Sequence, residues 1–208
     1  MKESKLKSRW PKDHFSWSQY NVWVNYGPAE FAKKYIYGGA DLTNPRMELG
    51  KTVADMLEHD EENEDPILEH LRVFLPHYQH REYEIRKQFN GITLVGKLDG
   101  FNENPMRLGE YKTGVRWTQE MADKTEQLDW YALLLHLQFG VNPLDVPFDL
   151  VWIPTKWDFP DDPKPTGEIY TFKTRRSYLD SIRIGKKIMK AWNEIGEFCA
   201  KEYRDIGM

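Results

Sequence analysis

The sequence predicts a single α/β domain in which helices come first and a mixed sheet follows. Three observations support this fold class. Helical patterns fill the chain before about residue 80, alternating apolar and polar residues begin after Arg81, and a long helical pattern separates the first strands from the last. The length of 208 residues fits one domain with a sizeable core, and the aromatic share of 14% favours dense packing.

The first third of the chain is expected to be helical. Residues 1–15 are basic and predict an N-terminal arm, which leaves 16–208 as the domain. Ser16 and Ser18 offer N-caps for a helix over 19–26, and Gly27-Pro28 separates it from a second helix that runs to about residue 37. Further helices are expected over 45–59 and 67–75, with the acidic run 60–65 as the loop between them.

The strands follow from alternation. Residues 82–90 and 92–101 predict two strands joined at Asn90-Gly91, a dipeptide typical of two-residue hairpins. The remaining elements are expected to be a strand over 107–112, a long helix over 118–139, strands over 146–154 and 168–173, and a terminal helix over 177–203.

Composition excludes several classes of protein. The counts of 29 basic and 33 acidic residues give a net charge of −4. No apolar run approaches the roughly 18 residues of a membrane span, and the basic N-terminus has no apolar signal segment. Cys199 is the only cysteine, which excludes an intramolecular disulfide framework and any four-cysteine zinc or iron–sulfur site. We therefore expect a soluble protein of the reducing cytoplasm.

One group of residues carries chemistry. Asp99 lies near the end of the second strand, and Glu110 and Lys112 are two apart on the third, so both point to one face. If these strands are antiparallel neighbours, Asp99 lies beside Glu110. Two carboxylates make an oxygen site suited to Mg²⁺ or Mn²⁺, and a nearby ammonium can orient a water or stabilise a phosphoryl group. This arrangement predicts metal-assisted hydrolysis of a phosphodiester.

The same residues resemble a known family. Asp99 followed by Glu110-Tyr111-Lys112 resembles the D…(D/E)xK signature of the PD-(D/E)xK nuclease superfamily, and VGKLDGF…LGEYKTG resembles its RecB-like branch. Gln127 and Tyr131 are similar to that branch's Q-x-x-x-Y motif. The match covers roughly residues 15–140. It implies a restriction-endonuclease-like αβββαβ core, with a central mixed sheet flanked by helices.

The resemblance assigns roles to individual residues. Asp99 and Glu110 would bind the metal with the backbone carbonyl of Tyr111, and Lys112 would orient the water. Gln127 and Tyr131, which share a helix face, would orient the site or contact nucleic acid.

The match also departs from the family. The segment ELGKTVADMLE resembles the G-x-x-x-H-x-x-x-E helix of the branch, but the position of the ligating histidine is Ala54. Glu58 matches the glutamate and is a candidate extra metal ligand, while Asp55 or Glu48 are alternatives that can reach the site. The iron–sulfur cluster of some relatives is excluded here, since it needs four cysteines.

The function expected from these residues and the resemblance is that of a Mg²⁺- or Mn²⁺-dependent DNA exonuclease in recombination, repair or phage DNA metabolism. Two alternatives stay open: a structure-selective or restriction-like endonuclease, and an inactive relative that binds nucleic acid or protein. The expected partners are DNA ends or single strands and, by resemblance, a second copy of the chain or a helicase or recombinase. Basic residues at 173–176 and at positions 183, 186, 187 and 190 of the last helix are candidate DNA contacts.

Overall fold

The computed structural model of the chain describes residues 10, 12–38, 45–59, 62–114, 116–159 and 162–205. Within helices and strands, the side chains of residues 46, 58, 158, 159 and 205 are not described. The helices are α1 (Trp17–Phe31), a π-helical turn (Ala32–Ile36), α2 (Pro45–His59), α3 (Pro66–Phe74), α4 (Gln119–Lys124), α5 (Glu126–Phe139), a 3₁₀ turn (Pro143–Asp145) and α6 (Tyr178–Asp205). The strands are β1 (Phe15–Ser16), β2 (His80–Phe89), β3 (Ile92–Glu103), β4 (Met106–Gly114), β5 (Phe148–Phe159), β6 (Asp162–Pro165) and β7 (Tyr170–Thr174).

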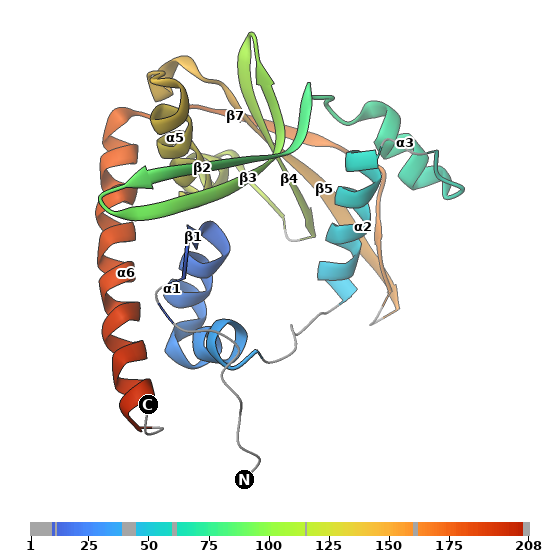
Figure 1. Cartoon of the computed structure of the whole chain (residues 1–208). Coiled ribbons are helices and arrows are strands. Elements are labelled where there is room, and N and C mark those ends of the chain that lie inside the picture. Colours follow the sequence, from blue (N-terminus) through green and yellow to red (C-terminus); the bar gives the residue numbers. More distant parts are fainter. Residues whose placement is uncertain are drawn as a thin grey trace.

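The strands form one seven-stranded mixed sheet in the order β1-β3-β4-β5-β6, with β2 also paired to β3 and β7 to β5 (Figure 1). The pairs β1–β3 and β4–β5 are parallel, and the other pairs are antiparallel. Helices flank this sheet, so the expected α/β fold with a central mixed sheet is confirmed.

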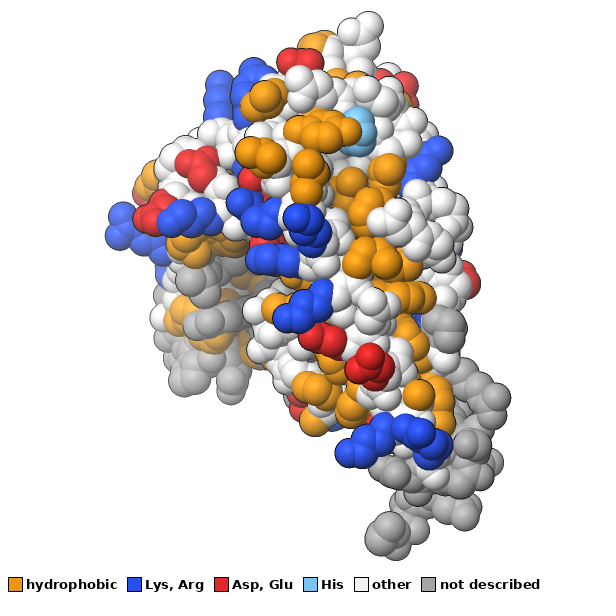
Figure 2. Space-filling model, turned by 90° about the vertical axis from the view of Figure 1, so that its left-hand side faces the viewer, with side chains coloured by type: hydrophobic (Ala, Val, Ile, Leu, Met, Phe, Trp, Pro, Cys, Tyr) orange, Lys and Arg blue, Asp and Glu red, His pale blue; other side chains and the backbone are white. Residues whose placement is uncertain are grey.

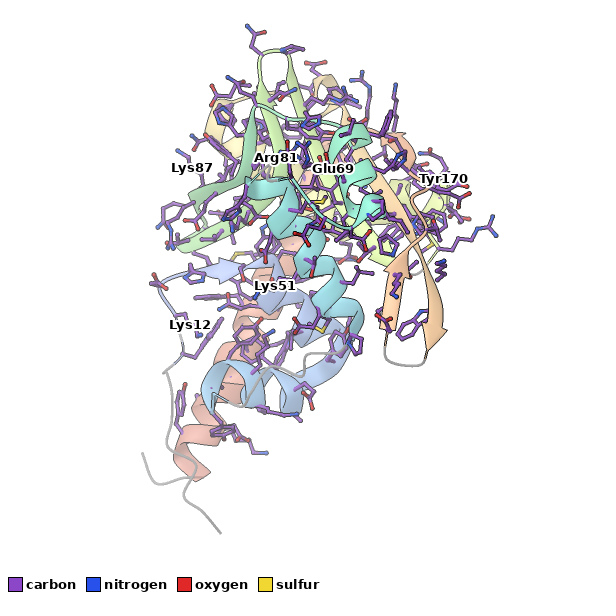
Figure 3. All side chains as sticks on the ribbon, turned by 90° about the vertical axis from the view of Figure 1, so that its right-hand side faces the viewer. Lys12, Lys51, Glu69, Arg81, Lys87 and Tyr170 are labelled. Atoms are coloured by element: carbon purple, nitrogen blue, oxygen red, sulfur yellow. The ribbon has the colours of Figure 1, made fainter. Side chains whose placement is uncertain are left out.

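Two hydrophobic clusters give the sheet its flanking layers. The larger joins α1, α5 and α6 to β1–β3 and includes Phe15, Trp130 and Ile188, all fully buried. The smaller joins α2 and α3 to β5 through residues such as Val53 and Leu71. Figure 3 shows α2 lying across this second side of the sheet, beside the β5–β6 hairpin. The sheet is therefore covered differently on its two faces, by a large aromatic core and by a smaller aliphatic one.

The first helix begins where the sequence predicts. Ser16 forms a capping box with Gln19: its Oγ accepts from the Gln19 N–H at 3.3 Å, and its own N–H donates to Gln19 Oε1 at 2.8 Å. Gly27 has φ +84° and kinks α1 at the predicted break. The last part of the expected arm belongs to the core, because Phe15 pairs with Leu94 and Trp10 packs on Trp192.

Two expectations about elements differ from the structure. The helix expected over 118–139 is divided into α4 and α5 at Thr125, whose φ and ψ of −69° and 121° are extended. Strand β6 was not expected because it contains Pro163 and Pro165. It pairs only with β5 and lies at the end of the strand order, where proline is tolerated. No helix of the described residues is long and apolar enough to cross a membrane.

Candidate active site

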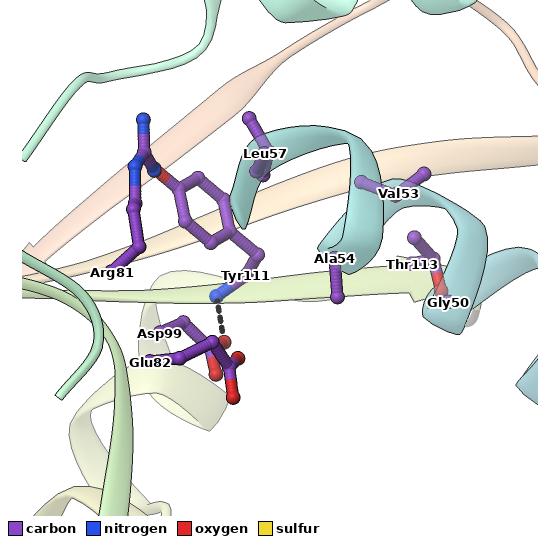
Figure 4. A pocket seen from close by; sticks show the side chains of 9 residues that line it. All are labelled: Gly50, Val53, Ala54, Leu57, Arg81, Glu82, Asp99, Tyr111 and Thr113. Atoms are coloured by element: carbon purple, nitrogen blue, oxygen red, sulfur yellow. Dashed lines mark hydrogen bonds between the residues drawn. The ribbon is translucent and has the colours of Figure 1, made fainter. Parts of the chain in front are cut away.

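The site lies where β3 and β4 separate. The antiparallel ladder between them runs from Glu103↔Met106 to Gly100↔Gly109 and stops there. Continued by one residue, that register places Asp99 opposite Glu110. Instead of a ladder bond, the Asp99 carboxylate accepts a hydrogen bond from the Tyr111 backbone N–H at 2.9 Å (Figure 4). The sequence prediction that Asp99 lies beside Glu110 therefore agrees with the register of the two strands.

Lys112 is bound to this acidic pair. Its ammonium donates to Glu110 Oε1 at 2.6 Å and to Gln127 Oε1 at 2.8 Å. Burial lowers the pKa of Lys112, but the charges of Glu110 and Asp99 raise it by more, so the pKa lies above its ordinary value. The side chain therefore remains an ammonium at neutral pH.

The pKa of Asp99 is also raised, but for a carboxyl group this favours the neutral form. Burial is the main cause that raises the pKa of its carboxyl group well above the ordinary value, and the charge of Glu110 is the second. The positive charge of Lys112 opposes this shift without cancelling it. An added cation would therefore favour the ionised form of Asp99.

Helix α5 supplies the two polar groups that the resemblance implies. The Gln127 amide nitrogen donates to Glu110 Oε1 at 2.6 Å and to the Tyr131 hydroxyl at 2.9 Å. The Tyr131 hydroxyl in turn donates to the Lys97 carbonyl at 3.0 Å. Gln127 thus contacts both Glu110 and Lys112, and Tyr131 ties it to β3. The five side chains proposed as catalytic are brought together.

A small, partly open pocket of about 60 Å³ lies beside Asp99, between the sheet and α2. Ala54 lines it, with Gly50 one turn before and Leu57 one turn after (Figure 4). The position that carries histidine in the resembled branch therefore faces the pocket with only a methyl group.

Two other candidate ligands of α2 do not line this pocket. Glu48 and Asp55 are exposed and are absent from its wall. Glu58 lies on α2, but its side chain is outside the described residues, so its role as a metal ligand stays an expectation.

Two residues of the pocket wall were missed by sequence reasoning. Arg81 donates to the Tyr111 hydroxyl at 2.6 Å, and its guanidinium lies 5.7 Å from the centre of that ring. Glu82 lies next to Asp99 in the pocket wall. The two-residue turn at Asn90-Gly91 sets the register that brings them beside Asp99 and Gly100, but the alternation of the strand does not show that they line a pocket.

The donor set fits a divalent cation. Glu110 is 2% exposed, and its Oε2 has no hydrogen-bond partner in the described structure. Leaving a buried carboxylate oxygen unpaired is costly unless another group binds it. Two carboxylates suffice for Mg²⁺, which keeps several waters and takes other ligands from phosphates. Among the described residues, however, no group of three or more His, Cys, Asp and Glu side chains is arranged to hold a metal ion.

The expected basic surface of α6 is largely neutralised. Arg176, just before α6, is buried and pairs with Asp129 at 2.6 Å. Arg183 pairs with Asp180 at 2.5 Å, and Lys187 pairs with Glu126. Figure 2, which shows the side of the molecule formed by α6, has lysine and arginine side chains lying among acidic and hydrophobic ones. The buried Arg176 is thus a structural residue, and cation stripes on α6 are weaker candidates for DNA contact than the sequence indicates.

Comparisons with known proteins place the fold. A crystal structure of a candidate exonuclease from Eubacterium rectale is similar to this chain, with a TM-score of 0.59 at 11% identity over 91% of this chain and 82% of that one. At this identity the likeness shows a shared fold. No family model matches the sequence, and no curated protein matches it.

Proposed function

We propose that this protein is a metal-dependent DNA nuclease that hydrolyses phosphodiester bonds, with an exonuclease as the favoured form. One observation carries the proposal. Asp99 and Glu110 meet where two strands diverge, and the second of them has a buried oxygen without a partner beside the Lys112 ammonium. The likeness in fold to a candidate exonuclease supports the same activity, and it is the reason for preferring an exonuclease.

The roles of the side chains follow from their contacts. Asp99 and Glu110 would hold Mg²⁺ or Mn²⁺, with the Tyr111 carbonyl as the further ligand that the resemblance implies. A bound divalent ion lowers the pKa of a water and polarises a phosphoryl oxygen. Lys112 stays protonated, so it donates hydrogen bonds to the attacking water or to the phosphate and does not accept the proton.

Gln127 and Tyr131 would position these groups. Gln127 fixes Lys112 through its carbonyl oxygen and Glu110 through its amide nitrogen, and Tyr131 fixes Gln127 against β3. A network of this kind holds the ammonium in one place before substrate binds, which is the condition for electrostatic stabilisation of a transition state.

The test is cleavage of end-labelled linear DNA beside covalently closed circular DNA, with Mg²⁺, Mn²⁺ or EDTA. Wild-type protein and Glu110→Gln are compared, with Glu120→Gln as the matched control, because Glu120 is an exposed residue of α4 that pairs with Lys124. We expect metal-dependent loss of the linear DNA alone, absent from Glu110→Gln and unchanged in Glu120→Gln.

Other outcomes correct the proposal in defined ways. Cutting of the circle would assign an endonuclease, since a circle has no ends. Absence of cleavage by folded protein under every metal would favour the inactive, binding-only alternative, for which the methyl group of Ala54 in the pocket wall is the supporting feature.

A further inference from the structure

Glu82 has an unusual backbone for its place in the fold. Across the described residues, two non-glycine residues have positive φ: Asn90 at +48° and Glu82 at +50°. Asn90 belongs to the Asn90-Gly91 hairpin turn, where such angles are required. Glu82 lies inside β2, where a left-handed conformation is unfavourable and persists only if the surroundings impose it.

The register explains where this strained residue points. Arg81 pairs with Gly100 and Tyr83 pairs with Leu98, so Glu82 stands opposite Asp99. Cross-strand neighbours share a face of the sheet. Figure 4 shows the Glu82 and Asp99 carboxyl groups directed into the same part of the pocket. Three carboxylates, those of Glu82, Asp99 and Glu110, therefore lie side by side on β2, β3 and β4.

On the other side of the pocket, the residue at the position of the resembled histidine is an alanine. Ala54 lines the same pocket from α2, and a methyl group cannot coordinate an ion. A second, independent observation is that the buried Oε2 of Glu110 has no hydrogen-bond partner in the described structure, so a cation could bind it.

We propose that Glu82 supplies the third carboxylate of the divalent-cation site, in place of the ligand that α2 does not provide at Ala54. This inference rests on the proposed function, since it adds a residue to the same centre. It accounts for a carboxylate held at a strained position beside Asp99, where neither a turn nor the hydrophobic core requires one.

Binding requires one rearrangement. Glu82 is paired with Lys97, whose side chain is 55% exposed, and no three acidic groups are yet arranged around an ion in the described structure. An ion pair with such an exposed lysine contributes little to stability, because water screens it. The Glu82 carboxylate can therefore turn from Lys97 to an ion at Asp99 at little cost.

The experiment is a calorimetric titration of the full chain with Mn²⁺ in the absence of nucleic acid. It compares wild type, Glu82→Gln and Glu84→Gln. Glu84 is the matched control because it lies two residues along β2, on the same face, and loses the same charge in its variant while its side chain is 56% exposed. We expect Mn²⁺ affinity to fall at least about tenfold in Glu82→Gln, as for loss of a group that orients or binds a metal, and to change less than about twofold in Glu84→Gln.

A second pair of variants separates binding from folding. Glu82→Asn keeps a residue that tolerates positive φ, so it should fold as wild type and lose the same affinity. Adding Ala54→Glu to Glu82→Gln should recover part of the affinity, because position 54 faces the same pocket.

The results distinguish the two proposals. Wild-type affinity in both Glu82 variants, with Mn²⁺ still bound, would overturn the role of Glu82 and leave the nuclease proposal intact. Failure of the folded wild-type protein to bind Mn²⁺ would overturn both. Folded Ala54→Glu/Glu82→Gln protein without any recovery would contradict the replacement of an α2 ligand by Glu82.

Discussion

Two ionic clusters border α5, each with a buried carboxylate, and they differ in charge balance. The strand cluster holds Asp99 and Glu110 against the single ammonium of Lys112. The arginine cluster lies on another face of the helix and holds Asp129 and Asp180 against Arg176 and Arg183.

The difference supports a structural role for the arginine cluster and the proposed functional role for the strand cluster. The terminal nitrogens of Arg176 donate to the carbonyls of Ala122 and Thr125 and to the Thr174 hydroxyl, at 2.7 to 3.3 Å. Its Nε makes no hydrogen bond in the described structure, but it lies 2.6 Å from Asp129 Oδ1, so the charge of the guanidinium is paired within the protein. The strand cluster has two carboxyl groups against one ammonium, and Glu110 Oε2 has no hydrogen-bond partner in the described structure. This imbalance is the reason for our proposal that a cation binds there.

The largest effect is expected at Lys112. Lys112→Ala removes the ammonium that orients the water and stabilises the phosphoryl group, and we expect turnover to fall by about 10²–10⁴-fold while Mn²⁺ binding persists. Single-turnover cleavage of linear DNA at saturating metal measures this. Cleavage close to the wild-type rate would contradict the mechanism.

The arginine cluster should respond in stability. Asp129→Asn leaves the buried Arg176 guanidinium without its carboxylate, and we expect the free energy of unfolding to fall by about 3 kcal/mol. For a chain of this size, Tm should drop by about 6–12 °C. Asp123→Asn on α4, an exposed position, is the control and should leave Tm within about 1 °C. A wild-type Tm for Asp129→Asn would show that the arginine cluster does not need its balance of charge.

Gln127 links the two halves of the strand cluster. Gln127→Ala releases both Lys112 and Glu110 from their orienting bonds, and we expect turnover to decrease by about 10–100-fold with little change in Tm. Gln119→Ala on α4, whose amide contacts the exposed Asp123, should leave turnover unchanged. Equal rates for the two variants would mean that Gln127 has no role in orienting the site.

The smallest effect is a gain in stability. Asp99→Asn keeps an acceptor for the Tyr111 N–H and removes a carboxyl group whose ionisation is opposed by burial and by Glu110, so the metal-free protein should unfold at a Tm about 2–4 °C higher, corresponding to about 1 kcal/mol. The sign follows from the pKa of Asp99, which is higher in the folded protein than in the unfolded chain. The wild-type protein therefore loses stability as pH rises from about 4 towards the folded pKa, and the Asn variant does not.

Scans in EDTA at neutral pH and below pH 4 check this prediction. The difference in Tm should vanish in acid, where the carboxyl group is protonated in both states. A lower Tm for Asp99→Asn at neutral pH would contradict the account.

Much of the site could be predicted from sequence because its signals are local. The spacing of Glu110 and Lys112 on a strand, and of Gln127 and Tyr131 on a helix, fixes which side chains share a face. The alternation after residue 80 and the Asn90-Gly91 turn predicted the β2–β3 hairpin.

The remainder depends on contacts between distant segments. The Asn90-Gly91 turn places Glu82 opposite Asp99, but its positive φ angle and its place in the wall of a pocket formed with α2 are not visible in the strand's pattern. Arg176 and Arg183 belong to two basic clusters in the sequence, and only the packing of α5 against α6 brings Asp129 to neutralise both. β6 was missed for a different reason: its prolines argue against a strand unless the strand is known to lie at an edge.

The central claim is that a divalent cation completes the strand cluster and makes it a nuclease centre. The most direct measurement titrates one protein preparation with Mn²⁺ and follows both Tm and cleavage of linear DNA. We predict that cleavage begins over the same concentrations that raise Tm. An increase of about 2.7 kcal/mol in stability is expected at a hundred times the Kd, and Glu110→Gln should abolish both responses. Cleavage that persists in EDTA, or a rise in Tm that Glu110→Gln retains in full, would contradict the claim.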